Sequence, residues 1–98
     1  MKHRKLLKLM SDFINDDVNE KKAETFCNEF MDDYYNFQDD LEQELMQDIC
    51  EMFDDVNVVC DSYEPNAEIR KMDRYCINEI VLRDKVVEIY KKIMQLMP

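Results

Sequence analysis

Hydrophobic residues recur every three or four positions in four long segments of the chain, which is the spacing of one face of a helix. The first two segments cover about 3–15 and 20–36, the second following an N-cap at Asn19. A third helix of about 21 residues is expected to begin after a cap at Asp39. The fourth is expected to follow a cap at Asn78 and to run to about residue 96. The pattern therefore predicts four amphipathic helices.

The stretch between the third and fourth helices is the longest connection. Pro65 interrupts the helical pattern, and residues 62–77 show no sustained period apart from a possible helical turn at 67–72. Glycine is absent from the sequence, which argues against the tight hairpins of a multi-stranded sheet. The sequence therefore predicts one all-α domain over residues 1–98. We expect an antiparallel four-helix bundle with one longer connection between helices three and four.

Most aromatic and methionine positions fall at the apolar helical spacing and are expected in the core. The same is expected of the four cysteines, which form no CxxC pair and have only His3 as a companion ligand, so that free thiols are predicted. The core set includes most of the eight methionines together with Phe13, Phe26, Phe30, Phe53 and Tyr90.

The net charge of −10 is unevenly distributed along the sequence. Residues 1–10 have four bases and no acid, residues 11–68 have nineteen acids and two lysines, and residues 69–98 have seven bases and four acids. A concentrated negative field favours encounter with basic proteins and repels nucleic acid and anionic membranes. We therefore expect a basic partner, although acidity that serves only solubility is the alternative.

Five acids in the predicted third helix advance by four, four, three and four residues, so they fall within about 80° of one another. Like charges at this spacing destabilise an isolated helix, and the segment has no lysine to offset them. Either the stripe is a solvated face or it binds a basic partner. The residues of this predicted stripe are Asp40, Glu44, Asp48, Glu51 and Asp55.

Three more acids, Asp61, Glu64 and Glu68, surround Tyr63 where the third helix gives way to the long connection. Tyr63 is either an exposed anchor for a partner or a hydrophobic contact that closes the end of the bundle. The carboxylates would steer a basic partner toward it. The bases that follow are expected to tether the connection to the acidic helices, and they are Arg70, Lys71 and Arg74.

Several kinds of chemistry lack the residues they require. With one histidine the chain cannot supply the paired Glu-x-x-His ligands of a di-iron bundle, and without glycine it has neither an EF-hand loop nor a phosphate loop. No catalytic residue, metal, cofactor or small-molecule substrate is therefore expected. The basic start leads into acids rather than an apolar segment, and no run reaches membrane-spanning length. We expect a cytoplasmic protein.

A run of specific residues resembles the bacterial self-protective colicin-like immunity family of the colicin D type, which includes immunity proteins of contact-dependent growth inhibition systems. The run comprises residues 61–65, Arg70, residues 75–79, Leu82, Arg83 and Val86. The resemblance implies a four-helix bundle that neutralises a cognate bacterial ribonuclease toxin, commonly a tRNase, by covering its basic active site. It also implies that Asp61 and Glu64 take the places of the acidic pair that faces the toxin. Asn78 departs from the aspartate more common in the family, which puts a charge-based role at this position in doubt.

Two functions follow as hypotheses. The first is an immunity protein whose carboxylates imitate RNA phosphates in a nuclease site. The alternative is an acidic adaptor or nucleic-acid mimic that binds a basic partner and inhibits no toxin. A weaker option is a dimer whose acidic surface serves solubility alone.

Overall fold

The computed structural model describes residues 2–97, and this part of the chain contains helices and no β-strand. The prediction of an all-α protein is therefore confirmed. The segments whose apolar residues recur at helical spacing form the four long helices. A short helix lies in the long connection. The elements are α1 (Lys2–Asn15), α2 (Glu20–Glu44), α3 (Gln47–Asp61), α4 (Ala67–Met72) and α5 (Glu79–Leu96).

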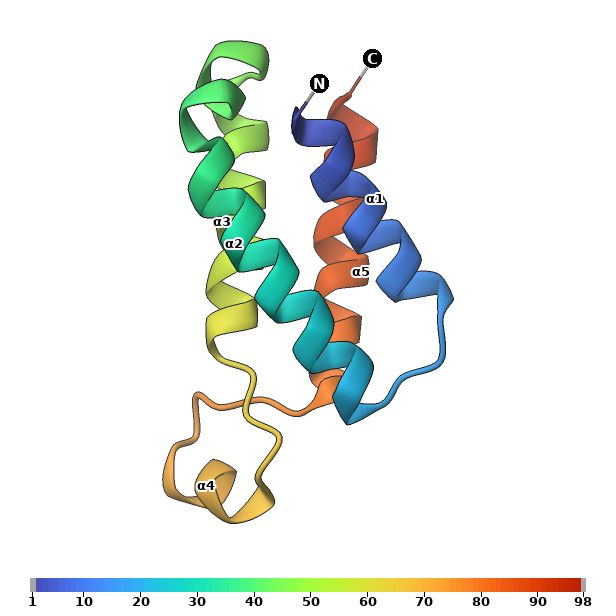
Figure 1. Ribbon diagram of the computed structural model, residues 1–98, viewed down its shortest axis with the longest axis vertical. Helices are drawn as coiled ribbons and strands as arrows, with labels where there is room; N and C mark the ends of the chain where they lie inside the picture. The colour runs from blue at the N-terminus through green and yellow to red at the C-terminus, as the bar shows by residue number, and fades with distance from the viewer. Residues whose placement is uncertain (1, 98) are drawn as a thin grey trace.

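The four long helices lie side by side (Figure 1). Helices α2 and α3 form a hairpin, and α1 and α5 cover its other side. Both α2 and α3 contact α5, and α1 contacts α2 and α5. The ends of the described chain lie close together at the end of the molecule where α2 turns into α3 (Figure 1). Within residues 2–97, α4 packs against none of the other helices and projects from the opposite end.

The apolar faces of the long helices meet in one core. Phe13 stacks on Phe26 with ring centroids 4.4 Å apart, and Phe26 contacts Phe30 at 5.7 Å. Burying each such ring contributes about 1.5–3 kcal/mol. The predicted core positions of these rings are thus confirmed. The buried residues are Leu6, Met10, Phe13, Ala23, Phe26, Cys27, Phe30, Leu41, Ile49, Phe53, Val56, Cys60, Leu82, Val86 and Ile93.

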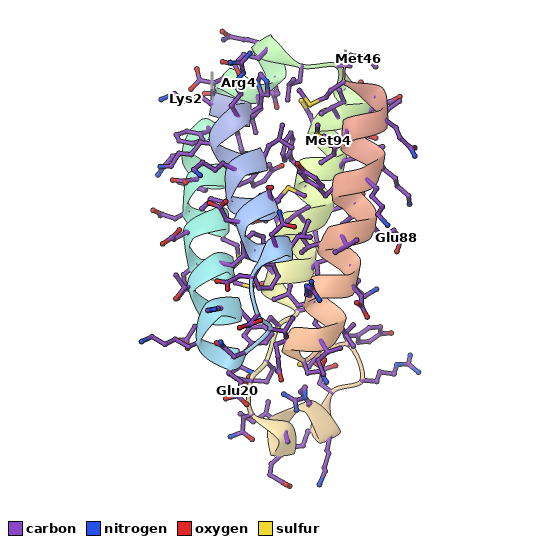
Figure 2. All side chains as sticks on the ribbon, turned by 90° about the vertical axis from the view of Figure 1, so that its right-hand side faces the viewer. Lys2, Arg4, Glu20, Met46, Glu88 and Met94 are labelled. Atoms are coloured by element: carbon purple, nitrogen blue, oxygen red, sulfur yellow. The ribbon has the colours of Figure 1, made fainter. Side chains whose placement is uncertain are left out.

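The methionine prediction is wrong for three of the seven methionines in residues 2–97, since the other four lie in the core or pack against it. Met10 is buried, but Met46, Met72 and Met94 are exposed, while the others described are half-buried, and Met1 lies outside the described residues. Met46 lies at the α2–α3 link and Met94 near the end of α5 (Figure 2). Helical spacing could not locate these residues because methionine packs at the margins of a core as readily as inside it.

Asparagine side chains cap three of the helices. Asn19 accepts a hydrogen bond from the backbone N–H of Lys22 at 2.9 Å, and Asn78 accepts one from Val81 at 2.9 Å. Both caps match the sequence prediction. Asn66 caps the short helix α4 in the same way. Each cap satisfies amide groups that have no partner inside the helix, and it stabilises the helix end by about 1 kcal/mol.

The predicted boundary between the second and third helices is wrong. Helix α2 continues through residues 37–44, so Asp39 lies inside it and is not a cap. Phe37 and Leu41 extend the apolar spacing set by Phe30 and Tyr34, and this packing outweighs the polar residues between them. In the sequence alone those polar residues resemble a turn and therefore predict a break.

The break between α2 and α3 falls instead at the extended backbone of Leu45 and Met46. Met46 provides no side-chain cap for α3. At the other side of the link, the thiol of Cys50 donates a hydrogen bond to the carbonyl oxygen of Leu41 at 3.3 Å. The same oxygen already accepts the N–H of Leu45 at 3.0 Å, so the thiol adds a second hydrogen bond and holds the start of α3 against the last turn of α2.

Candidate functional site

Folding separates the charges of the chain into two faces. Helices α2 and α3 contain fourteen acids and two lysines, a net charge of −12, whereas α1 and α5 contain eight bases and four acids, a net charge of +4. We call the surface of α2 and α3 the acidic face. Figure 1 shows these two helices together on one side, with α1 and α5 on the other. On the basic side, Lys2 and Arg4 lie at one end of α1, whereas Glu20 begins α2 at the opposite end (Figure 2).

The five acids of the predicted stripe do not share one helix. Asp40 and Glu44 are on α2, because that helix is longer than predicted. Glu44 accepts a hydrogen bond from Nδ1 of the buried His3 at 3.1 Å, and this bond lowers the pKa of the Glu44 carboxyl below its usual range. Asp48, Glu51 and Asp55 remain together on the exposed side of α3. The stripe is therefore three residues long.

Two separate recesses lie between α2 and α3, and we call the surface of the two helices that joins them the α2–α3 groove. The first, which we call the link recess, lies beside the Leu45–Met46 link and has a volume of about 480 Å³. On its wall the hydroxyl of Tyr34 donates a hydrogen bond to Asp54 at 3.1 Å. Burial raises the pKa of Tyr34, which favours the protonated hydroxyl that donates this bond. The link recess is lined by Tyr34, Glu42, Leu45, Gln47, Cys50, Glu51 and Asp54.

The second, the bend recess, lies where α3 ends and has a volume of about 230 Å³. Its floor includes two buried cysteines. The hydrogen bond with Cys27, together with burial, raises the pKa of the Cys60 thiol, which leaves it neutral and unreactive. Exposed Glu24 and Asp61 lie at the rim. The bend recess is lined by Glu24, Cys27, Asn28, Met31, Cys60, Asp61, Tyr63 and Pro65.

Another hollow, of about 410 Å³, lies between α1 and α2. Its lining has three acids, Asp12, Asp16 and Glu29, and two lysines, Lys21 and Lys22, and Lys22 forms an ion pair with Asp16. The lysines therefore offset most of the negative charge there. The recesses of the α2–α3 groove differ, since carboxylates are the charged groups of their linings.

Tyr63 is half-buried and packs against the core at the end of α3. Its hydroxyl donates to the carbonyl oxygen of Glu20 at 3.3 Å. The backbone around it pairs with the segment before α5, because Glu64 N donates to Ile77 O and Ile77 N donates to Ser62 O, both at 2.9 Å. These bonds fix the direction of the chain as it leaves α3, and they place Asp61 at the rim of the bend recess.

The bases of the long connection do not tether it to the acidic helices, so that prediction is wrong. Arg70 donates to the carbonyl oxygen of Glu64 at 2.6 Å, Lys71 pairs with Glu68, and Arg74 lies over the ring of Tyr75. All three contacts stay inside the connection. The connection projects from the end of the molecule, so these side chains cannot reach α2 and α3. The carboxylate of Glu64 accepts the N–H of Asn66 and that of Glu68 pairs with Lys71, whereas Asp61 forms no ion pair among the described residues.

The stability of the protein is expected to depend on Tyr63 at high pH. Burial and the nearby carboxylates of Glu79 and Glu20 raise the pKa of Tyr63 from 10.0 to about 12. Because the folded-state pKa is the higher one, the contribution of the phenol is fully present below pH 10 and is lost as pH rises through about 12. Urea unfolding should show that Tyr63→Phe is less stable than the wild type at pH 7 by about 1 kcal/mol. The difference should shrink between pH 10 and 12, and a constant difference would contradict the shift.

The sequence did not single out four residues that build the recesses, namely Tyr34, Glu24, Glu42 and Asp54. The periodicity of a single helix does not reveal them, because the site lies between two helices. The spacing of Glu24, Met31 and Tyr34 along α2 is the one feature of the sequence that could have indicated the recesses. Those positions lie on one side of α2, but the facing side of α3 is known only once the link is placed at residues 45–46.

Comparisons with protein-family models, with curated proteins and with solved structures found no match. None of the helices in residues 2–97 is long and apolar enough to cross a membrane. In the same part of the chain, no three His, Cys, Asp or Glu side chains are grouped so that they could hold a metal ion.

Proposed function

We propose that this protein is an immunity protein that neutralises a cognate bacterial nuclease toxin, with a tRNase as the first candidate. The observation that carries the proposal is the net charge of −12 on two adjacent helices. The likeness of residues 61–86 to the colicin-like immunity family adds the class of partner. We also propose that the long helices form the antiparallel four-helix bundle of that family, with the long connection between α3 and α5.

The proposed mechanism is substrate mimicry. Carboxylates of the acidic face would occupy the positions of RNA phosphates and form charge-assisted hydrogen bonds with lysines and arginines of the toxin. A basic active site covered in this way cannot bind RNA. The protein itself performs no reaction, and it works in the bacterial cytoplasm, where such a toxin meets tRNA.

A second function, an adaptor that joins a basic protein to another partner, is favoured by the connection around α4. Met72 is 86% exposed and Tyr75 is 69% exposed, and α4 packs on none of the long helices described. Exposed apolar residues on a projecting element are typical of a binding surface. An adaptor would use both surfaces at once, whereas an immunity protein needs the acidic face alone.

The discriminating experiment uses the protein encoded by the adjacent gene. It should be produced with this protein, captured, and assayed for cleavage of tRNA with and without this protein in stoichiometric amount. Loss of cleavage in a stable complex supports the immunity function. A stable complex with a neighbour that has no nuclease activity would support the adaptor, and a neighbour that cleaves tRNA equally well with this protein bound would refute inhibition.

The association rate is expected to fall steeply with salt. Electrostatic steering raises association rates by about 10- to 1,000-fold, and an ionic strength of about 0.5 M screens most of it. Stopped-flow measurements should therefore show a decrease of tenfold or more from ~20 mM to ~0.5 M salt. The dissociation rate should change less. An association rate that is independent of salt would show that the acidic face does not steer the encounter.

A further inference from the structure

We propose that the α2–α3 groove holds one segment of a partner protein that carries two basic side chains about 15 Å apart, one in the link recess and one in the bend recess. The distance follows from Cys50 and Cys60, which lie ten residues apart on α3 in the two linings, at a rise of 1.5 Å per residue. The inference rests on the basic partner of the proposed function. It does not require that partner to be a nuclease.

The two recesses are built alike. Each has a cysteine in its lining, a tyrosine on its wall and carboxylates among its lining side chains. Lysine and arginine bury their aliphatic stems against apolar surface while the charged head stays at the rim. A tyrosine ring beside that head adds a cation–π attraction. In each recess the apolar lining therefore suits the aliphatic stem of a lysine or arginine, and the tyrosine and carboxylates suit its charged head.

The surface between the recesses suits continuous contact with one segment. Asp54, Val58 and Asp61 are spaced by four and three residues, so they lie along one side of α3 from the link recess to the bend recess. Val58 is 56% exposed although it is apolar. A segment in the groove would cover this valine between its two basic side chains. Separate partners in the two recesses would leave it in water.

Charge complementarity selects the occupant. The groove lies on the acidic face, and the acids at the recesses have no basic partner among the described ion pairs. A second copy of this chain is a poorer fit, because each copy has a net charge of −10 and the bases of α1 and α5 yield only +4. An anionic segment would be repelled. A basic segment of another protein is the occupant that neutralises the groove.

The experiment uses two alanine- and glutamine-based helical peptides, each with two arginines. In one peptide the arginines are at positions i and i+11, about 16.5 Å apart on one side, and in the other they are at i and i+4, about 6 Å apart. Binding to the full-length protein is measured by calorimetry at low salt, with amide NMR shifts to locate the peptide. The i,i+11 peptide is expected to bind about tenfold more tightly, because only it engages both recesses. Equal affinities would overturn the proposal.

Matched variants separate the recesses from bulk charge. Glu51→Gln with Asp54→Asn removes two charges from the link recess, and Glu24→Gln with Asp61→Asn removes two from the bend recess. Either pair should abolish the preference for the i,i+11 peptide. The control pair Glu29→Gln with Asp84→Asn makes the same charge change at exposed positions outside the groove, so it should retain the preference.

Loss of the preference in the control pair would overturn the proposal, since bulk charge would then explain binding. Peptide-dependent shifts confined to α1 and α5 would overturn it as well, and so would sedimentation of the free protein as a dimer whose interface covers the groove. The test is independent of toxin inhibition. If the peptides behave as expected and no nuclease is neutralised, the proposed function fails while the groove assignment stands, and the reverse result removes only the groove assignment.

Discussion

The variant Asp61→Lys with Glu64→Lys is expected to lose binding of the cognate toxin by at least about 100-fold and to leave producing cells unprotected. Coupling between close charge pairs across an interface is about 1.5–7 kcal/mol, and reversal replaces attraction with repulsion. Even two pairs at the lower limit amount to about 3 kcal/mol, which corresponds to a factor above 100. Growth of cells that express the toxin together with either form of this protein measures the effect.

The fold should tolerate the Asp61→Lys, Glu64→Lys change. Asp61 is exposed, and Glu64 accepts one local hydrogen bond, from the backbone N–H of Asn66 at 3.1 Å. Its loss costs about 1 kcal/mol, which circular dichroism and thermal melting would detect as a small shift. The control variant, Asp17→Lys with Asp84→Lys, makes the same charge change at exposed positions outside α2 and α3 and should protect cells nearly as well. Retained protection by the bend variant would remove these two residues from the interface.

The sequence was sufficient to predict the helices whose ends carry a chemical signal. Asn19 and Asn78 are good caps at the start of apolar periodic segments, and both boundaries are correct. The α2–α3 boundary has no such signal, since Met46 makes no cap hydrogen bond and the acids at 39 and 40 resemble a break. Local preference favoured a turn at that point, but packing of Phe37 and Leu41 decided the structure.

The candidate site was predictable in its charge but not in its shape. The excess of acids between residues 11 and 68 is visible in the sequence, and the fold places most of them on two adjacent helices. The recesses depend on which sides of α2 and α3 face each other, and a shift of a few residues in the link changes that pairing. For this reason the stripe from Asp40 to Asp55 was wrong as one helix face, although three of its members lie together on α3.

Phe30→Ala is expected to lower the free energy of unfolding by about 3–5 kcal/mol. The Phe30 ring is fully buried, with centroids 5.7 Å from Phe26 and 6.2 Å from Tyr34. Removing it loses the transfer free energy of the ring and leaves a cavity that the neighbouring helices fill only in part. A domain of this size is stable by about 5–15 kcal/mol, so the variant should lose a large fraction of its stability. Urea unfolding measures the change as a lower midpoint with an unchanged slope.

The control for Phe30→Ala is Tyr35→Ala, on the same helix, where the side chain is 76% exposed and the change should stay within about 0.5 kcal/mol. A loss below ~1 kcal/mol for Phe30→Ala would show that its ring is not part of the core. The same ring also supports the candidate site, because it stacks against Tyr34 on the wall of the link recess. Folded Phe30→Ala protein should therefore bind the i,i+11 peptide more weakly than Tyr35→Ala protein does, which links the packing of the core to the shape of the acidic groove.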